Sequence, residues 1–207
     1  MVSDFVNYGI GENYLEDWGY KEALREIYQN FIDFGDYEIK IDKTRYDRVV
    51  VTLKNTYIPD SLEFLQIGKS VKTNENSIGK HGEGLKMAFL VLLRNKEYMH
   101  IRYGNTIIHS LWNLSIIGKT LSLKLTKTLK TNNNFEVKFT CPKSIFTAFN
   151  EKVITKEDII FKDSYYGSIV NKPIGELYSG GLFVTTLNNL KKAYDIPPNK
   201  LALDRVS

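Results

Sequence analysis

Hydrophobic positions near the start of the chain follow the spacing of a helix, and those that come after it follow the spacing of strands. Across residues 20–34 the apolar side chains recur every three or four positions, at Leu24, Ile27, Tyr28, Phe31 and Ile32. This period predicts an amphipathic helix that ends near Gly35. Beyond it, β-branched residues at 37–41 and 49–53 predict two strands joined by a polar turn at 43–47.

The remainder of the chain is expected to be mainly strands. Segments of this kind lie at 98–103, 106–112, 120–126, 135–140, 175–178 and 181–186. Short helical stretches are expected from Pro142 to about residue 150 and around 156–160, whereas residues 1–17 show no clear period and are expected to form an N-terminal arm. The order of elements predicts a single α+β domain over residues 1–207, with helices on one face of a mixed, mostly antiparallel sheet.

Composition narrows the classes of protein that remain. A hydrophobic content of 43% in 207 residues is enough for a real core. The single cysteine, Cys141, excludes an internal disulfide framework and a metal site built from cysteines. No apolar run reaches membrane-spanning length, so a cytoplasmic protein without a membrane partner is expected. The net charge of +4 is too small to imply nucleic-acid binding by itself.

A glycine-rich segment precedes the most apolar run of the chain. Gly79, Gly82 and Gly84 stand directly before the apolar residues 85–93, which are expected to form a buried helix. Glycines let backbone N–H groups approach an anion, and the start of a helix adds its positive end, so this segment is a candidate phosphate site. The alternative is a tight connection with no ligand. The polar loop at 68–80 is long for a compact domain, which favours a function for it.

The polar face of the first predicted helix offers a second candidate site. Glu26, Asn30 and Asp33 stand at i, i+4 and i+7, opposite the apolar face. A carboxylate can deprotonate a water molecule and an amide oxygen can coordinate Mg²⁺, so these residues and the glycine-rich loop could form one site for nucleotide hydrolysis. The alternative is an ordinary solvated helix face.

In both motifs the chain resembles the GHKL superfamily, the gyrase, heat-shock chaperone, histidine kinase and mismatch-repair ATPases that share the Bergerat fold. Residues 26–33 match the box Glu-x-x-x-Asn-x-x-Asp, and residues 79–84 match Gly-x-x-Gly-x-Gly. The resemblance is nearest to a phage and bacterial branch of GHKL-like proteins of unassigned role. It implies a two-layer sandwich with an ATP lid at 68–80, with Glu26 as general base and Asn30 as the Mg²⁺ ligand.

The resemblance also implies a set of residues that bind ATP. This set consists of Asp33, Asn55, Ser70, Lys72, Gly79, Lys80, His81, Gly82, Glu83, Gly84, Leu85 and Lys86. Two members have open alternatives: His81 could be a solvent-facing loop histidine, and Lys86 could face either phosphate or solvent. The threonine of the family's last motif also stays open, among Thr126, Thr131, Thr140 and Thr185.

The adenine box departs from the family pattern. Where the family has Asp-x-Gly-x-Gly, this chain has Asn55-Thr56-Tyr57-Ile58-Pro59. The carbonyl oxygen of Asn55 can still accept a hydrogen bond from the adenine amino group, and Tyr57 could narrow the pocket or stack on the base.

These features lead to one expected function and two alternatives. The resemblance implies slow hydrolysis of MgATP, with lid closure and homodimerisation through the lid or the N-terminal arm acting as a switch on an unknown protein or nucleic-acid client. A non-catalytic nucleotide-binding or protein-interaction module is the first alternative, because the adenine box is altered. A DNA-binding protein without nucleotide is the second. Members of the branch usually continue past the pair Asp204-Arg205, so the chain is expected to be the N-terminal part of a longer protein.

Overall fold

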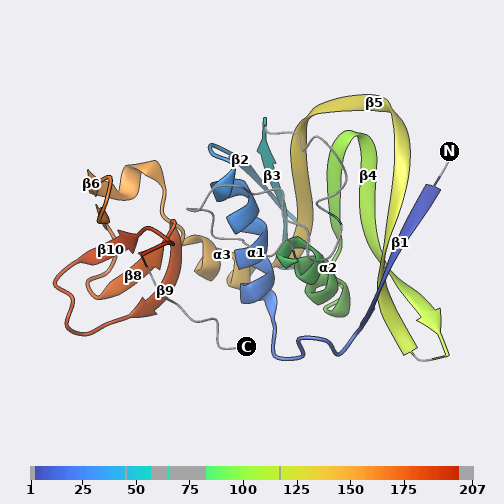
Figure 1. The fold of residues 1–207 in the computed structure, drawn as a ribbon, viewed down its shortest axis with the longest axis horizontal. Coiled ribbons are helices and arrows are strands. Elements are labelled where there is room, and N and C mark those ends of the chain that lie inside the picture. The colour runs from blue at the N-terminus through green and yellow to red at the C-terminus, as the bar shows by residue number, and fades with distance from the viewer. Residues whose placement is uncertain (1–2, 45, 57–64, 66–82, 117, 201–207) are drawn as a thin grey trace. The chain divides into compact units, whose positions relative to one another are not determined.

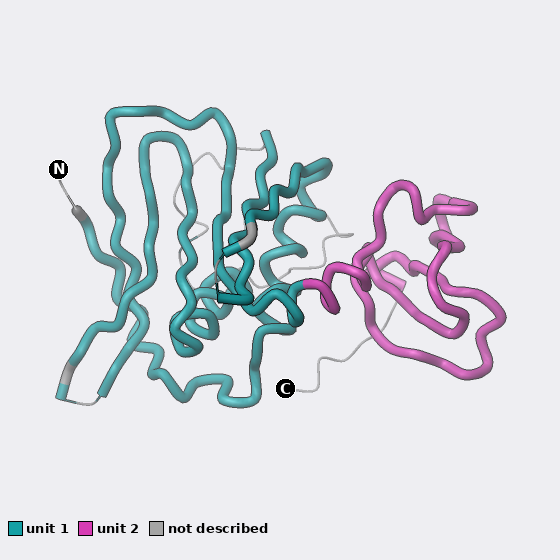
Figure 2. Tube along the Cα trace, turned by 180° about the vertical axis from the view of Figure 1, so that it is seen from behind, with its two compact units in different colours: residues 1–71, 81–146 teal, residues 72–80, 147–207 magenta. Residues whose placement is uncertain are grey.

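A computed structural model describes residues 3–44, 46–56, 65, 83–116 and 118–200 of this α+β protein. The described chain forms two compact units (Figure 2), the first holding β1 to β5 with α1 and α2, and the second holding β6 to β10. The helix α3 (Lys143–Asn150) leads from one unit into the other. None of the helices in the described residues combines the length and the apolar character that a membrane crossing requires.

The first unit is built on an antiparallel sheet. Its strands are β1 (Ser3–Gly11), β2 (Glu38–Lys43), β3 (Arg48–Asn55), β4 (Met99–Ser115) and β5 (Gly118–Pro142). The order is β1-β5-β3-β2, and β4 also pairs with β5. Both β4 and β5 bend back on themselves, and β4 lies inside β5 (Figure 1).

The bend in β4 has a local cause. Gly104 has a φ of +51°, a value that glycine adopts readily, and the pairing register shifts on both sides of it. Residues 106–115 therefore pair with the first half of β5, and residues 99–102 pair with its second half. The four strands expected between 98 and 140 are thus the halves of two long, bent strands.

Two helices, α1 (Tyr20–Asp33) and α2 (Gly84–Arg94), pack against each other and against one face of this sheet. Burial alternates strictly along β3, so that Val49, Val51 and Leu53 face the helices. Leu24, Ile27 and Phe31 of α1 and residues 87–92 of α2 complete the core, and each large apolar side chain contributes about 1.5–3 kcal/mol by its burial. The helix expected over residues 20–34 is confirmed as α1.

The second unit has a sheet of its own. Its strands are β6 (Ile159–Asp163), β7 (Gly167–Val170), β8 (Glu176–Ser179), β9 (Leu182–Thr186) and β10 (Ala193–Ile196), in the order β6-β7-β10-β8-β9. Only β10 and β8 pair in parallel among these described strands. Val170, Tyr178 and Ala193 form its core, with Phe183 packed against them.

Candidate functional site

The two sequence motifs meet where α1 packs on α2. Glu26 lies in the middle of α1 and is only 7% exposed. A Cβ atom at position 84 would stand 2.7 Å from Cδ of Glu26 and 3.2 Å from its Cγ, which is closer than nonbonded carbons normally approach. The missing side chain of Gly84 therefore leaves the space that the Glu26 carboxylate fills. The carboxylate lies beside the first residue of α2, at the helix end that attracts negative charge.

A buried amide positions this carboxylate. Gln29 is fully buried on α1, one turn after Glu26. With its amide oriented to satisfy both neighbours, Nε2 donates to Oε2 of Glu26 at 3.3 Å and Oε1 accepts from Nε of Arg25 at 3.2 Å. Gln29 is not among the residues predicted from the sequence; its signal is an amide three residues after Glu26, on the same side of the helix.

Asn30 follows Glu26 by one helical turn and is half-buried. Its Nδ2 donates a 2.7 Å hydrogen bond to the backbone oxygen of Glu26. Because the nitrogen is engaged with the helix, a metal ligand from this side chain has to be Oδ1, the atom type that Mg²⁺ prefers. Asp33, half-buried in the last turn of α1, adds a carboxylate to the same helix.

Asn55 ends β3 as a buried polar residue. It is 5% exposed, and neither its Oδ1 nor its Nδ2 has a hydrogen-bond partner among the described residues. It continues the inward alternation of β3, and Phe135, its partner on β5, packs on Phe31 of α1 with ring centroids 5.8 Å apart. Two unpaired polar groups at one buried position cost about 1–3 kcal/mol each, so a ligand that pairs with both would remove this cost.

Lys86 is in the first turn of α2 and does not face solvent. It is 1% exposed, and its burial lowers the pKa of the amine to about 8, while the nearby Glu83 acts in the opposite direction. Of the two alternatives for Lys86, solvent exposure is therefore wrong for this structure. Glu83 stands at the N-cap position of α2, directly before its first residue. Leu85 is part of the buried core, so the side chain of Leu85 packs and only its backbone can contribute to a site.

The structure thus places eight of the predicted site residues. Glu26, Asn30 and Asp33 lie on α1, Asn55 ends β3, and residues 83–86 form the start of α2. Glu26 and Gly84 are brought into contact. The remaining predicted residues, which are Ser70, Lys72, Gly79, Lys80, His81 and Gly82, lie outside the described part of the chain, as does the whole of the expected lid at 68–80.

Comparison with known proteins finds a partial similarity. A search against models of protein families finds no match. An uncharacterised protein of Mycoplasma pneumoniae is 32% identical to this chain over 94 residues, which cover 39% of this chain and 36% of the relative. The chain therefore spans about a third of the relative that it matches.

Proposed function

We propose that the protein binds MgATP where α1, α2 and the end of β3 come together, in a Bergerat-type fold, and that it hydrolyses ATP slowly. The observation that carries this proposal is the contact between the Glu26 carboxylate and Gly84. It joins a buried potential base to the start of a helix that follows a glycine-rich segment. A general base and a phosphate-binding helix end are the two parts that hydrolysis of a phosphoanhydride needs most.

Each described residue has a distinct role in this proposal. Glu26 takes a proton from the attacking water as its oxygen bonds to the γ-phosphorus, and the bond to the β–γ bridging oxygen breaks with its electron pair leaving on ADP. Gln29 holds the carboxylate in place. Asn30 would hold Mg²⁺, which when bound offsets the charge of the phosphates. Lys86 and the backbone N–H groups at the start of α2 bind the phosphate oxygens.

Asn55 is the proposed adenine contact. Its Oδ1, which has no partner among the residues that the structure describes, can accept from the adenine amino group while its Nδ2 donates to the adjacent ring nitrogen. An aspartate at this position would offer acceptors only. The substitution of the family's aspartate by Asn55 is therefore compatible with adenine binding, and it adds a donor that the ring nitrogen can use.

The biological use of the site is proposed from the GHKL resemblance. ATP would close the lid at 68–80 and favour a homodimer through the lid or through the N-terminal segment, and hydrolysis would reset it. Residues 3–11 of that segment, expected to be part of an arm, form the strand β1 and pair with β5. Such a switch would act on a protein or nucleic-acid partner, and the expected compartment is the cytoplasm.

The second candidate function is a non-catalytic nucleotide-binding module. It is favoured by the loss of both glycines of the adenine box, which Tyr57 and Pro59 replace. Under this alternative the nucleotide is a structural ligand, and Glu26 has no role in turnover.

The variant Glu26→Gln separates the two functions, because it keeps the shape of the side chain and removes the base. We expect calorimetry to show ATP affinity within about 3-fold of wild type, while phosphate release falls at least 100-fold, which is the usual contribution of a general base. Equal phosphate release by both proteins would contradict the ATPase proposal. Binding of MgATP without turnover in the wild type would support the module, and absence of binding would contradict both.

A further inference from the structure

The face of the first sheet that the helices leave uncovered carries a row of residues from neighbouring strands. The row begins at Phe5 on β1, which stands directly opposite Lys124 on β5. Lys124 in turn stands opposite His109 on β4. Phe5 is 58% exposed, and Lys124 lies between the buried residues Leu123 and Leu125, so its side chain is on the face away from the helices.

The row continues across the bend of β4. The rings of His109 and His100 are in contact, with centroids 5.5 Å apart, although they belong to opposite halves of the strand. His100 stands opposite Lys138 on β5, whose neighbours Val137 and Phe139 are fully buried. We call Phe5, Lys124, His109, His100 and Lys138 the sheet row. Its members are far apart in the chain, so the sequence alone does not show that they lie in one line.

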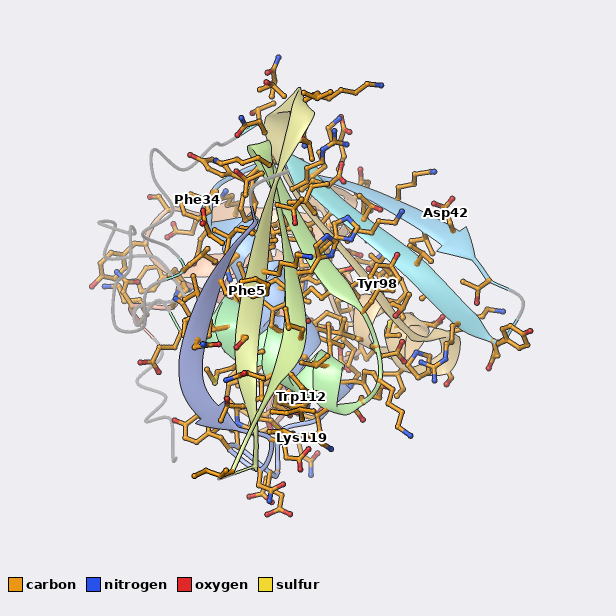
Figure 3. All side chains as sticks on the ribbon, turned by 90° about the vertical axis from the view of Figure 1, so that its right-hand side faces the viewer. Phe5, Phe34, Asp42, Tyr98, Trp112 and Lys119 are labelled. Atoms are coloured by element: carbon orange, nitrogen blue, oxygen red, sulfur yellow. The ribbon has the colours of Figure 1, made fainter. Side chains whose placement is uncertain are left out.

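Further residues extend the sheet row and widen it. Lys138 stands opposite Thr52 on β3, and Thr52 opposite Lys40 on β2. Five steps between paired strands, at about 4.8 Å each, and the 5.5 Å between the rings of His109 and His100 make the line from Phe5 to Lys40 roughly 30 Å long. Tyr98 stacks on His100 with centroids 5.9 Å apart and an interplanar angle of 16°. Figure 3 views this face, with Phe5 and Tyr98 labelled on it.

The sheet row combines flat rings with positive charge. Burial, followed by the neighbouring titratable groups of His109, Lys138 and Arg102, lowers the pKa of His100 to about 4. Burial and the charge of Lys124 lower the pKa of His109. Both rings are therefore uncharged at neutral pH. Lys124 and Lys138 make no ion pair with another described residue, whereas Lys40 pairs with Asp42 at the end of the line.

We propose that the sheet row is a binding track for single-stranded nucleic acid. The ammonium groups of Lys124 and Lys138 would contact phosphates, and the rings of Phe5 and His109 would stack on bases. His100, which stacks on Tyr98 and contacts His109, would hold the ring of His109 in place. Rings that lie beside cations on an open sheet suit a strand whose bases are unpaired, since a duplex hides the faces of its bases. A track of this length suits a site at the lower end of the 4–16 nucleotides that small folds cover. The inference does not rest on the ATP site.

The charge component can be tested by fluorescence anisotropy with the full chain and a labelled 20-nucleotide oligo(dT). At 50 mM NaCl we expect the double variant Lys124→Ala/Lys138→Ala to bind at least 10-fold more weakly than wild type. The slope of log affinity against log salt should become shallower by about 1.4, because each phosphate contact contributes about 0.7. The matched control, Lys191→Ala/Lys192→Ala, removes two exposed charges from the second unit and should bind within 2-fold of wild type.

The ring component has its own variant and control. We expect Phe5→Ala to weaken binding about 5-fold or more without changing the salt slope, since stacking on one base is worth at least about 1 kcal/mol. Tyr46→Ala removes an aromatic ring that is 84% exposed in the β2–β3 turn and should have no effect. Oligonucleotides that carry 4-thiothymidine should crosslink to peptides containing Phe5 or Tyr98, a result that does not depend on any variant.

Three outcomes would overturn the proposal. These are an absence of binding to the oligonucleotide, equal weakening by the row variant and its control, and binding of a 20-base-pair duplex as tight as that of the single strand. Glu26→Gln should leave the oligonucleotide affinity unchanged, so a failure of the ATP proposal and a failure of this one are distinguishable.

Discussion

At the scale of single residues, the main feature of the first unit is a group of buried polar side chains on α1, β3 and α2. Glu26, Gln29, Asn55 and Lys86 are each at most 7% exposed. Burial of a polar or charged group costs free energy unless it is paired, and a pairing ligand can supply what the protein omits. The same residues are therefore expected to lower the stability of the empty protein and to raise its affinity for nucleotide.

The variant Asn55→Leu tests this trade-off at the end of β3. Leucine has a similar volume and leaves no unpaired polar group, so the free energy of unfolding without ligand should rise by about 1–3 kcal/mol. Urea denaturation measures this gain. Calorimetry should at the same time show ATP binding weakened at least 10-fold, with the preference for ATP over GTP reduced. A loss of stability together with unchanged ATP affinity would contradict the role of Asn55.

Lys86→Met tests the same trade-off for a charged side chain. Here the effect of the substitution on the free energy of unfolding also depends on pH. Because burial lowers the pKa of Lys86 from 10.5 to about 8, the unfolded chain binds more protons than the folded chain between these two values. The contribution of Lys86 to stability therefore rises with pH in this window, and below pH 8 its charged form costs about 3 kcal/mol. We expect Lys86→Met to be more stable than wild type at pH 7, and the difference to shrink as pH approaches 10. Urea denaturation at several pH values measures this difference, and a difference that grows with pH would contradict the argument.

At the scale of elements, the sequence predicted helices better than strands. The helix α1 follows from its apolar period over four turns, which no strand period imitates. Between residues 98 and 140 the four predicted strands are two, because the chain bends within the sheet at Gly104 and the asparagines at 132–134 are part of the continuous strand β5. A local pattern shows where pairing is interrupted and cannot show that the strand continues beyond the interruption.

Short elements escaped prediction for a related reason. The strands β7 and β10 have four residues each and were not predicted, whereas β8, which is equally short, was expected at 175–178 because Ser179-Gly180 separates it from the next strand. Ile159 and Ile160 belong to β6 although they were expected to continue a helical stretch. For the candidate site, the motif residues could be selected from their spacing. The contact of Glu26 with Gly84 and the position of Gln29 depend on how two helices pack, which a single sequence does not specify.

The segment between β1 and α1 is held by one side chain of α2. Arg94 donates from its two terminal nitrogens to the backbone oxygens of Glu12, Tyr14, Leu15 and Trp18, at 2.5–3.3 Å. Arg94→Ala should lower the free energy of unfolding by about 2–4 kcal/mol, since charged hydrogen bonds contribute more than neutral ones. Arg94→Lys keeps the charge without the fork of donors and should recover less than half of the loss. Urea denaturation compares the three proteins, and full recovery by lysine would show that the charge alone is responsible.

At the scale of the whole molecule, the two compact units allow a prediction about where ATP acts. Every described residue proposed to bind ATP belongs to the first unit, on α1, β3 or α2. A ligand stabilises only the states to which it binds, by about 2.7 kcal/mol when its concentration is 100 times Kd. Saturating MgATP should therefore slow amide hydrogen exchange in the first unit, most of all in α1, at the end of β3 and at the start of α2.

Hydrogen exchange is measured by mass spectrometry on the Glu26→Gln protein, because this variant should leave the nucleotide unhydrolysed during the experiment. Peptides from β6 to β10 serve as an internal control, because no described residue of the proposed site lies in that sheet. Protection confined to the first unit would support the assignment of the nucleotide to α1, β3 and α2. Protection confined to β6 to β10 would place the nucleotide elsewhere and would contradict the roles of Asn55 and Lys86 together. Protection of both units would mean that ATP binding in the first unit is coupled to the stability of the second, as a nucleotide-driven switch requires.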